Sequence, residues 1–264
     1  MIFNLTINLE EMKELIKTNI SLPKEKRVTQ CFLGPVGCGK SYTVLQTCKE
    51  LNKRVSIINL SNTTRENITG IPAVNFKELF ANLLNKANKK EAIESIIYTK
   101  PYFIDSDVIF IDEITNASED EISIVMQMIT ERIAGTHKLK DDTVIILAGN
   151  NTDDSDLASE LPSPILTRCS VFKVKSNIEE TLKYAKENNY HKKVISFLEN
   201  MIKENKTLSY KKQENNMPFA TNRTIKFLSN LMYVTEKLNL EEKDFEDMVR
   251  GVIGKEYSEM FVKS

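Results

Sequence analysis

The sequence lacks the features that mark membrane, secreted and strongly charged proteins. No apolar run approaches the roughly 20 residues of a membrane-spanning helix. The opening residues, MIFNLTINLEEM, carry acids, unlike a signal peptide. The formal net charge is −1, from 36 basic and 37 acidic residues, so no global field favours nucleic acid or an anionic membrane. These absences predict a cytoplasmic protein without a membrane span.

Cysteine and histidine, the usual zinc ligands, are also scarce. The 4 cysteines contain no C-x-x-C pair, which argues against a zinc site and a disulfide framework and fits a reducing cytosol. The 2 histidines are isolated, and we expect both at the surface rather than as ligands or bases. These residues are Cys31, Cys38, Cys48, Cys169, His137 and His191.

Glycine is rare, with 8 in 264 residues, yet three glycines fall close together in one stretch. That stretch, Val28–Tyr42, reads VTQCFLGPVGCGKSY; its apolar run stops at Gly34 and helical spacing begins at Lys40. The pattern G-x-x-x-x-G-K-[ST] between a strand and a helix predicts a phosphate-binding loop. The alternative is a chance match on an ordinary turn, which the flanking strand and helix patterns disfavour.

The composition of this loop suits phosphate, because phosphate oxygens require convergent backbone N–H groups, small side chains and unusual backbone angles. Gly34, Gly37 and Gly39 allow this, and a helix starting near Gly39 adds N–H donors and a positive dipole end. Lys40 can reach the β- and γ-phosphates, and the Ser41 hydroxyl can bind Mg2+. The predicted nucleotide-binding residues are Gly34, Pro35, Val36, Gly37, Cys38, Gly39, Lys40, Ser41 and Tyr42.

Apolar runs alternate with helical patterns up to residue 175, and only helical patterns follow. This order indicates a parallel α/β domain over 1–175 and a small helical domain of three or four helices over 176–264. We expect helices over 9–19, 40–51, 76–98 and from 118, strands over 31–33, 54–60, 107–111, 143–148 and 171–174, a hairpin or turn over 135–142, and polar turns over 61–74 and 161–164. Capping boxes are expected at Asn8 with Glu11 and Ser118 with Glu121, and one apolar helix face at Ile122, Val125, Ile129 and Ile133.

Polar residues follow two further apolar runs at their carboxyl ends, where parallel sheets bind ligands. Asp112 and Glu113 follow the run 107–111; Asp112 could hold Mg2+ through water, and Glu113 could orient and deprotonate an attacking water. Asn150 follows the run 143–148 and suits positioning that water beside the γ-phosphate. Each could instead be an ordinary solvated strand end. Their joint occurrence with a phosphate loop favours the functional interpretation.

These motifs resemble the Walker A, Walker B and sensor 1 elements of AAA+ ATPases, and more narrowly those of the MoxR-type clade and its phage and bacterial relatives. The motifs are GPVGCGKS, VIFIDE and AGN, with supporting blocks INLSNTTRENITGIP, DEITNASEDEISIVMQMITERIAGTHKLKDDTVIILAGNN, ELPSPILTRCSVF and ATNRTIKFLSNL. Two positions depart from the family pattern: Cys169 replaces a common aromatic, and Asn151 a common proline. The resemblance implies an α/β P-loop NTPase sheet flanked by helices, a small all-α lid domain, and ATP and Mg2+ as cofactors.

The resemblance also implies two functional arginines. Arg168, in LTRC, matches the arginine finger that reaches the γ-phosphate on a neighbouring subunit; otherwise it is a surface or sheet-capping cation. Arg223, in ATNRT, matches sensor 2 on the lid helix; otherwise it is a solvated helix residue. The segments 61–74 and 135–142 match the clade's helix 2 insertion and the hairpin before sensor 1, and 76–98 is a candidate docking insertion.

Three functions fit these residues. The leading hypothesis is a Mg2+-dependent ATPase that forms a homo-hexameric ring, with Arg168 acting in trans, and remodels a partner protein. By resemblance, that partner carries a von Willebrand factor A-type domain. The second is a nucleic-acid-linked AAA+ motor, and the third is a nucleotide-gated interaction module with little turnover, against which the intact Glu113 argues. The second hypothesis needs a basic surface that binds nucleic acid, and the candidate residues for it are scattered: Lys86, Lys89, Lys90, Lys138, Lys140, Lys211 and Lys212.

Overall fold

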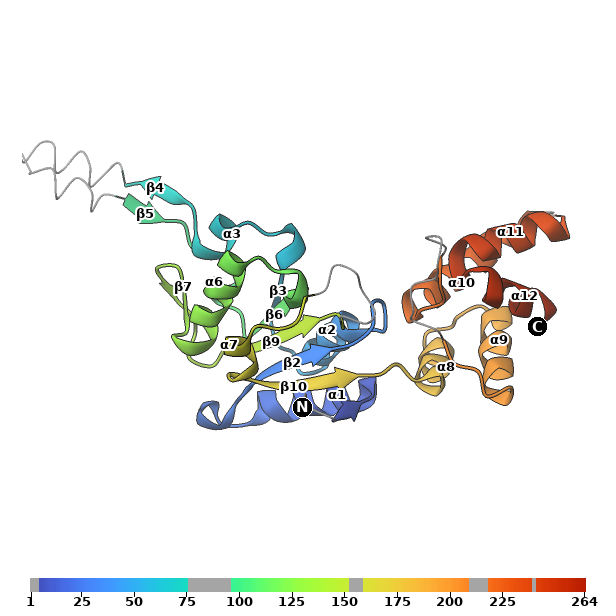
Figure 1. The fold of residues 1–264 in the computed structure, drawn as a ribbon, viewed down its shortest axis with the longest axis horizontal. Helices are drawn as coiled ribbons and strands as arrows, with labels where there is room; N and C mark the ends of the chain where they lie inside the picture. Colours follow the sequence, from blue (N-terminus) through green and yellow to red (C-terminus); the bar gives the residue numbers. More distant parts are fainter. Residues whose placement is uncertain (1–4, 76–95, 152–158, 209–217, 239–240) are drawn as a thin grey trace, which may run out of the picture.

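A parallel sheet of six strands forms the centre of the first part of the chain, in the order β1-β10-β2-β9-β6-β3 (Figure 1). The computed structural model describes residues 5–75, 96–151, 159–208, 218–238 and 241–264. Two small antiparallel ribbons, β4–β5 and β7–β8, accompany the sheet. The strands are β1 (Thr6–Ile7), β2 (Thr29–Leu33), β3 (Val55–Asn59), β4 (Pro72–Val74), β5 (Ile96–Tyr98), β6 (Val108–Asp112), β7 (Ile133–Ala134), β8 (His137–Lys138), β9 (Val144–Gly149) and β10 (Cys169–Val174).

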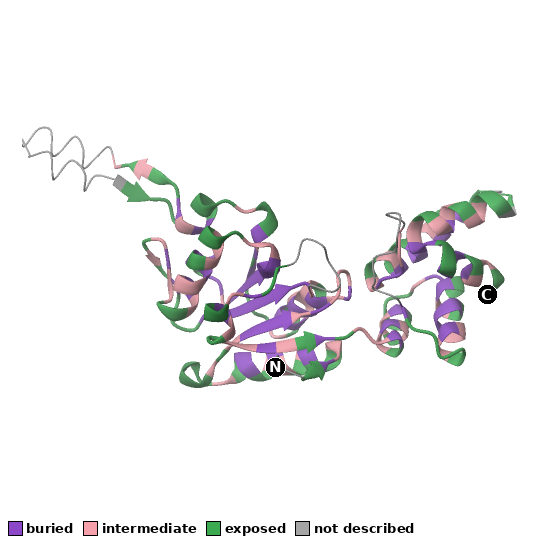
Figure 2. Cartoon of the chain, viewed as in Figure 1, coloured by how far each residue is buried: buried purple, intermediate pink, exposed green. Residues whose placement is uncertain are grey.

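The central strands are apolar on both faces because helices cover both sides of the sheet. Along β6, Val108 and Phe110 face one hydrophobic cluster, while Ile109 and Ile111 face the other. This alternation follows from the two-residue period of a strand. The strands are accordingly the most continuously buried part of the chain (Figure 2).

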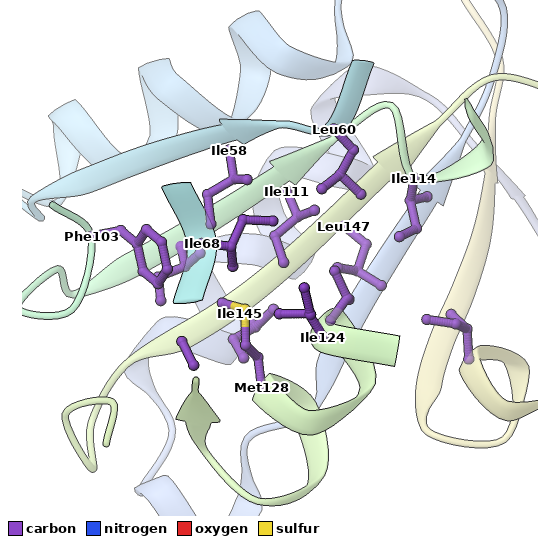
Figure 3. Packing of buried hydrophobic residues seen from close by; sticks show 14 of the residues in the cluster. Ile58, Leu60, Ile68, Phe103, Ile111, Ile114, Ile124, Met128, Ile145 and Leu147 are labelled. Atoms are coloured by element: carbon purple, nitrogen blue, oxygen red, sulfur yellow. The ribbon is translucent and has the colours of Figure 1, made fainter. Parts of the chain in front are cut away.

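Helices α1 (Leu9–Ser21) and α2 (Lys40–Glu50) cover one face of the sheet, and α3 (Arg65–Thr69) and α6 (Glu119–Thr130) cover the other. The hydrophobic cluster on the face covered by α3 and α6 includes Ile68 of α3 and Met128 of α6, packed against Ile111 and Leu147 of the sheet (Figure 3). Both predicted capping boxes are confirmed, at Asn8 with Glu11 and at Ser118 with Glu121. The short helices η1 (Lys24–Lys26), η2 (Leu60–Asn62), η3 (Ile114–Asn116) and α7 (Ser163–Leu166) lie in the connections.

The C-terminal helical region has a hydrophobic cluster of its own, which includes Phe197, Leu228 and Phe261. The described residues there form five helices, against a prediction of three or four, because α11 and α12 are separate elements divided at Gly254. The helices are α8 (Ile178–Glu187), α9 (Lys192–Lys203), α10 (Asn222–Thr235), α11 (Glu242–Ile253) and α12 (Lys255–Lys263). None of the helices among the described residues combines the length and apolarity needed to cross a bilayer.

One prediction about the segment after β3 was wrong, and a second was wrong at its end. The supposed polar turn over 61–74 contains α3 and β4, and Ile68 of α3 is fully buried. The predicted helix over 76–98 lies outside the described residues except for its end, where Ile96–Tyr98 form strand β5. Strand β5 pairs with β4 more than twenty residues earlier, so its conformation depends on a partner that a local pattern cannot show.

Two other elements differ from the sequence prediction. The segment 161–164 was predicted as a loop but leads into α7, whose first turn accommodates proline because N–H groups there lack helical partners. The buried residues of α6 are Ile124, Val125 and Met128, whereas Ile122 and Ile129 of the predicted helix face are only partly buried. Ile133, also predicted on that face, lies beyond α6 in strand β7.

His191 was predicted at the surface but is buried, 7% exposed. It caps the start of α9, where its Nδ1 accepts a hydrogen bond from the Lys193 amide at 3.2 Å. Its Nε2 lies 2.8 Å from an oxygen of Glu236, which follows α10. Its contact with Glu236, which is distant in sequence, explains its burial; the local sequence pattern does not.

We expect Ile111→Ala to lower the free energy of unfolding by about 2–5 kcal/mol, because it leaves a cavity beneath α6. The matched control is Ile71→Ala, since Ile71 is 54% exposed and its truncation should change stability by less than about 0.5 kcal/mol. Urea unfolding followed by circular dichroism checks both variants. Equal midpoint shifts would contradict the assigned burial.

Candidate active site

The loop between β2 and α2 has the backbone that the glycine pattern predicted at two of its three glycines. Gly37 and Gly39 have φ of 74° and 115°, and Gly39 is the N-cap of α2. Residues that carry a side chain rarely adopt such positive φ angles. Gly34 does not have a positive φ; instead, a Cβ atom there would lie 2.7 Å from the carbonyl oxygen of Val174 in β10. Close approach of two strands, rather than backbone freedom, therefore requires this glycine.

Lys40 is the first residue of α2, and its side chain is buried within the loop. The ammonium donates to the carbonyl oxygens of Gly34 at 2.7 Å and Pro35 at 3.0 Å, and to Oδ1 of Asn150 at 3.3 Å. A charged amine buried with three oxygen partners is held in the centre of the loop. The positive charge thus lies where the helix dipole and the backbone N–H groups also favour anions.

Ser41 and Asp112 meet across the edge of the sheet. The Ser41 hydroxyl donates to Oδ2 of Asp112 at 2.6 Å, and Oδ1 of Asp112 accepts from the Glu113 amide at 3.0 Å. A hydroxyl and a carboxylate are hard oxygen ligands, which Mg2+ prefers. The described residues contain no cluster of three or more histidine, cysteine or acidic side chains suited to a metal ion. Few protein ligands are expected for Mg2+, which usually keeps waters and binds substrate phosphates.

Glu113 and Asn150 are joined by a direct hydrogen bond. Nδ2 of Asn150 donates to Oε2 of Glu113 at 2.7 Å, so the amide of Asn150 bridges the carboxylate and the Lys40 ammonium. Glu113 has φ 62° and ψ 35°, a left-handed conformation that costs a non-glycine residue about 1–3 kcal/mol. Such strain is typical of functional sites.

Burial raises the pKa of Glu113 above its ordinary value, and the charge of Asp112 raises it further. The charges of Lys40 and Arg223 oppose this increase, as does the hydrogen bond from Asn150. A carboxylate whose proton affinity is increased in this way is better suited to accept a proton near neutral pH.

The sequence interpretation missed Asn116 and Thr115, which follow Glu113 in the turn η3. Nδ2 of Asn116 donates to Oε2 of Glu113 at 2.9 Å. The hydroxyl of Thr115 accepts a hydrogen bond from the backbone N–H of Asn150 at 3.0 Å. Their only sequence signal is their position directly after an acidic pair at a strand end. Asparagine and threonine are common in turns, so this signal does not distinguish them from ordinary turn residues.

The start of α10 reaches the phosphate loop. Nδ2 of Asn222 donates to the carbonyl oxygen of Cys38 at 2.7 Å, and Thr221 lies against Gly37, with Oγ1 3.0 Å from a Cβ position there. The next residue, Arg223, is exposed, and its charge acts on Glu113. The structure therefore brings Arg223 to the same site as the strand-end residues.

Tyr42 connects α2 with the helical region. It is 46% exposed, and its ring meets the edge of Tyr184 of α8 with centroids 5.3 Å apart. Of the other predicted loop residues, Pro35 contributes a carbonyl to Lys40 and Cys38 is buried in the core. Val36 lies on the loop, partly exposed.

Arg168 lies apart from these residues. It precedes β10, whose first residue, Cys169, pairs with Thr29 at the amino end of β2. The phosphate loop follows the other end of β2, about 15 Å away at roughly 3.3 Å per residue. Arg168 lines a groove of about 840 Å³ beside α3 and α6, and its guanidinium donates to the Pro164 carbonyl at 3.1 Å.

The fold and the loop between β2 and α2 place the chain among P-loop nucleotide-binding proteins. Residues 30–178 match the family described as ATPase family associated with various cellular activities (AAA), and the chain belongs to that family. Its parallel sheet followed by a helical region is the AAA+ fold. Membership implies ATP hydrolysis; AAA ATPases bind ATP with Mg2+ and typically oligomerise.

Solved structures are similar to the chain at low sequence identity. RuvB from Thermotoga maritima, a Holliday junction branch migration motor, is 15% identical with a TM-score of 0.46, over 96% of this chain and 67% of that one. NtrX from Brucella abortus is 11% identical with a TM-score of 0.49, over 86% and 50%. AMPPCP-bound DnaA from Aquifex aeolicus is 15% identical with a TM-score of 0.45, over 89% and 66%. No curated protein matches the sequence.

We expect Glu113→Gln to stabilise the protein at neutral pH. The raised pKa means that the folded state binds the Glu113 proton more tightly than the unfolded chain does. The contribution of this proton is fully present below the ordinary pKa of glutamate and is lost as the pH rises through the folded value. Thermal unfolding between about pH 4 and about pH 8 should therefore show a Tm advantage for the variant that grows with pH.

The control for this pH series is Glu25→Gln, because Glu25 is exposed in η1. Its Tm difference from wild type should stay small at every pH. A Tm difference for Glu113→Gln that is constant across the series would contradict the raised pKa of the Glu113 carboxyl in the folded state.

Proposed function

We propose that the residues at the carboxyl ends of strands β2, β9 and β6 form an active site that hydrolyses ATP, and that each of them has a specific role in the reaction. The observation that supports this proposal is the linked set of contacts from Lys40 through Asn150 to Glu113, beside the pair of Ser41 and Asp112. Lys40 binds the β- and γ-phosphate oxygens. Ser41 and Asp112 hold Mg2+, which neutralises phosphate charge when bound.

In this proposal Glu113 is the general base and Asn150 positions the water. The carboxylate takes a proton from water as the water oxygen bonds to the γ-phosphorus, and the bond from that phosphorus to the β-γ bridging oxygen breaks to release ADP. The left-handed backbone and the two amide donors hold the carboxylate in place. Arg223, from the start of α10, adds positive charge to the same site.

We infer further that Arg168 acts in trans within a ring, which we propose has six subunits. Its position at the amino end of β10, away from the loop of its own subunit, supports this role. A separate hydrophobic cluster in α8–α12 supports treating residues 176–264 as a lid domain distinct from 1–175. The contact between Asn222 and Cys38 would let the lid respond to nucleotide in the loop.

The identity of the partner protein is inferred only from the resemblance of the sequence motifs to those of the MoxR-type clade. The motif order favours a MoxR-type ATPase that remodels a protein, and the clade suggests a von Willebrand factor A-type domain in that protein. The competing nucleic-acid motor needs free basic residues. Of the candidates, Lys138 pairs with Asp141 at 3.5 Å and Lys140 with Asp107 at 3.0 Å. The others, Lys86, Lys89, Lys90, Lys211 and Lys212, lie outside the described residues.

We expect Lys40→Ala to lose both ATP binding and turnover, and Glu113→Gln to retain binding while losing turnover. The first change removes the charge that contacts phosphate, and the second removes only the base. Fluorescent-nucleotide binding and phosphate release measure the two quantities. Lys49→Ala, at an exposed position on the same helix, is the matched control and should behave as wild type. Wild-type turnover in Glu113→Gln would overturn the assignment of the base.

A mixing experiment tests Arg168 in trans. Arg168→Ala and Glu113→Gln should each be inactive, and mixed subunits should regain activity wherever an intact Glu113 faces an intact Arg168. Random mixing at equal amounts predicts about a quarter of the wild-type interfaces. Arg54→Ala, exposed before the amino end of β3, is the control and should stay active alone.

Three further measurements separate the competing functions. Mass in solution with a slowly hydrolysed ATP analogue should show the ring, and activity of Arg168→Ala alone would argue against it. A salt-dependent gel shift at low ionic strength would favour the nucleic-acid motor. ATP-dependent assembly without phosphate release would favour the nucleotide-gated module.

A further inference from the structure

Thr115 occupies an unusual position between two elements of the site. It lies in η3, two residues after Glu113, and is only 4% exposed. Its hydroxyl oxygen accepts a hydrogen bond from the backbone N–H of Asn150 at 3.0 Å. Strand β9 ends at Gly149, so this N–H is the first donor beyond the strand. The hydroxyl therefore satisfies a buried donor just where the sheet ladder stops.

The rest of Thr115 also holds the end of β9. A Cβ atom at Gly149 would lie 2.8 Å from the methyl carbon of Thr115, so the two residues are in close contact. The carbonyl oxygen of Thr115 accepts from the Ser159 amide at 2.8 Å. The methyl, hydroxyl and carbonyl groups thus contact Gly149, Asn150 and Ser159 respectively, and a displacement of this threonine would move Asn150.

The position of Asn150 matters because its amide links two charged groups. Oδ1 accepts from the Lys40 ammonium at 3.3 Å, and Nδ2 donates to Glu113 at 2.7 Å. Both contacts depend on where the backbone of Asn150 lies. A shift of the order of 1 Å in such a group can cost roughly 100-fold in rate without removing any reacting atom.

We propose that Thr115 is a positioning residue for hydrolysis, whose hydroxyl fixes the backbone of Asn150 and through it the water-positioning amide. This inference rests on the proposed function. Among the described hydrogen bonds, Thr115 reaches Lys40 only through Asn150, and the Gly34 and Pro35 carbonyls hold Lys40 independently. We therefore expect Thr115 to act on the rate of the chemical step more than on nucleotide affinity.

The test compares two substitutions that divide the threonine side chain. Thr115→Val keeps the shape and the methyl group but leaves the Asn150 N–H without its acceptor. Thr115→Ser keeps the hydroxyl and removes the methyl group. We expect Thr115→Val to lower kcat by about 10- to 100-fold with nucleotide Kd changed less than about twofold. We expect Thr115→Ser to retain kcat within about threefold of wild type.

Thr143→Val is a matched control for the loss of a buried hydroxyl. Thr143 is also 4% exposed, precedes the amino end of β9, and donates its hydroxyl to the Ser106 carbonyl at 2.7 Å. It should lower Tm as Thr115→Val does, yet leave kcat unchanged. If Thr115→Val does not fold, Thr115→Ala removes the same hydroxyl and carries the same expectation.

The outcomes separate this inference from the function on which it rests. Wild-type kcat in Thr115→Val, or equal losses in Thr115→Val and Thr115→Ser, would overturn the role of the hydroxyl. If Glu113→Gln is inactive while Thr115→Val is fully active, only the positioning role fails. If Glu113→Gln keeps wild-type turnover, the proposed site itself fails.

Discussion

Three adjacent parallel strands end at the same edge of the sheet, and the candidate site depends on this constraint. Strand β9 lies between β2 and β6, with Leu33 opposite Gly149 and Ile111 opposite Leu147. The residues that follow these strands therefore meet although they are far apart in sequence: Lys40 and Asn150 are separated by 110 positions. A slip in register would move every side chain to the other face and separate them.

Within this edge, the charged side chains of Lys40, Asp112 and Glu113 each form hydrogen bonds with neutral groups. The Lys40 ammonium is held by carbonyl and amide oxygens, Asp112 by the Ser41 hydroxyl, and Glu113 by two amides. Glu113 is the most constrained of these groups, in a left-handed backbone with a raised pKa. Strain and burial at one carboxylate, in an otherwise regular sheet, are features typical of functional sites.

The same topology that gathers these residues separates Arg168 from them. An arginine at the start of β10 lies at the amino edge of the sheet, and no rotamer change brings it across the length of β2. The helical region approaches from the opposite direction, with Asn222 on the loop carbonyl and Arg223 near Glu113. The chain thus carries the loop, the acids and the contact from α10 at one edge of the sheet, and the exposed cation of Arg168 at the other.

Local patterns in the sequence were sufficient for the phosphate loop, both capping boxes and the buried strands, because each depends on residues within a few positions of one another. Contacts between distant residues decided the rest. They gave α3 and β4 in place of a turn, buried His191 against Glu236, and explained Gly34 by its approach to Val174. The contact between Thr115 and Asn150 became visible only when the end of β9 was placed beside η3, because a hydrogen bond across 35 positions leaves no periodic trace in the chain.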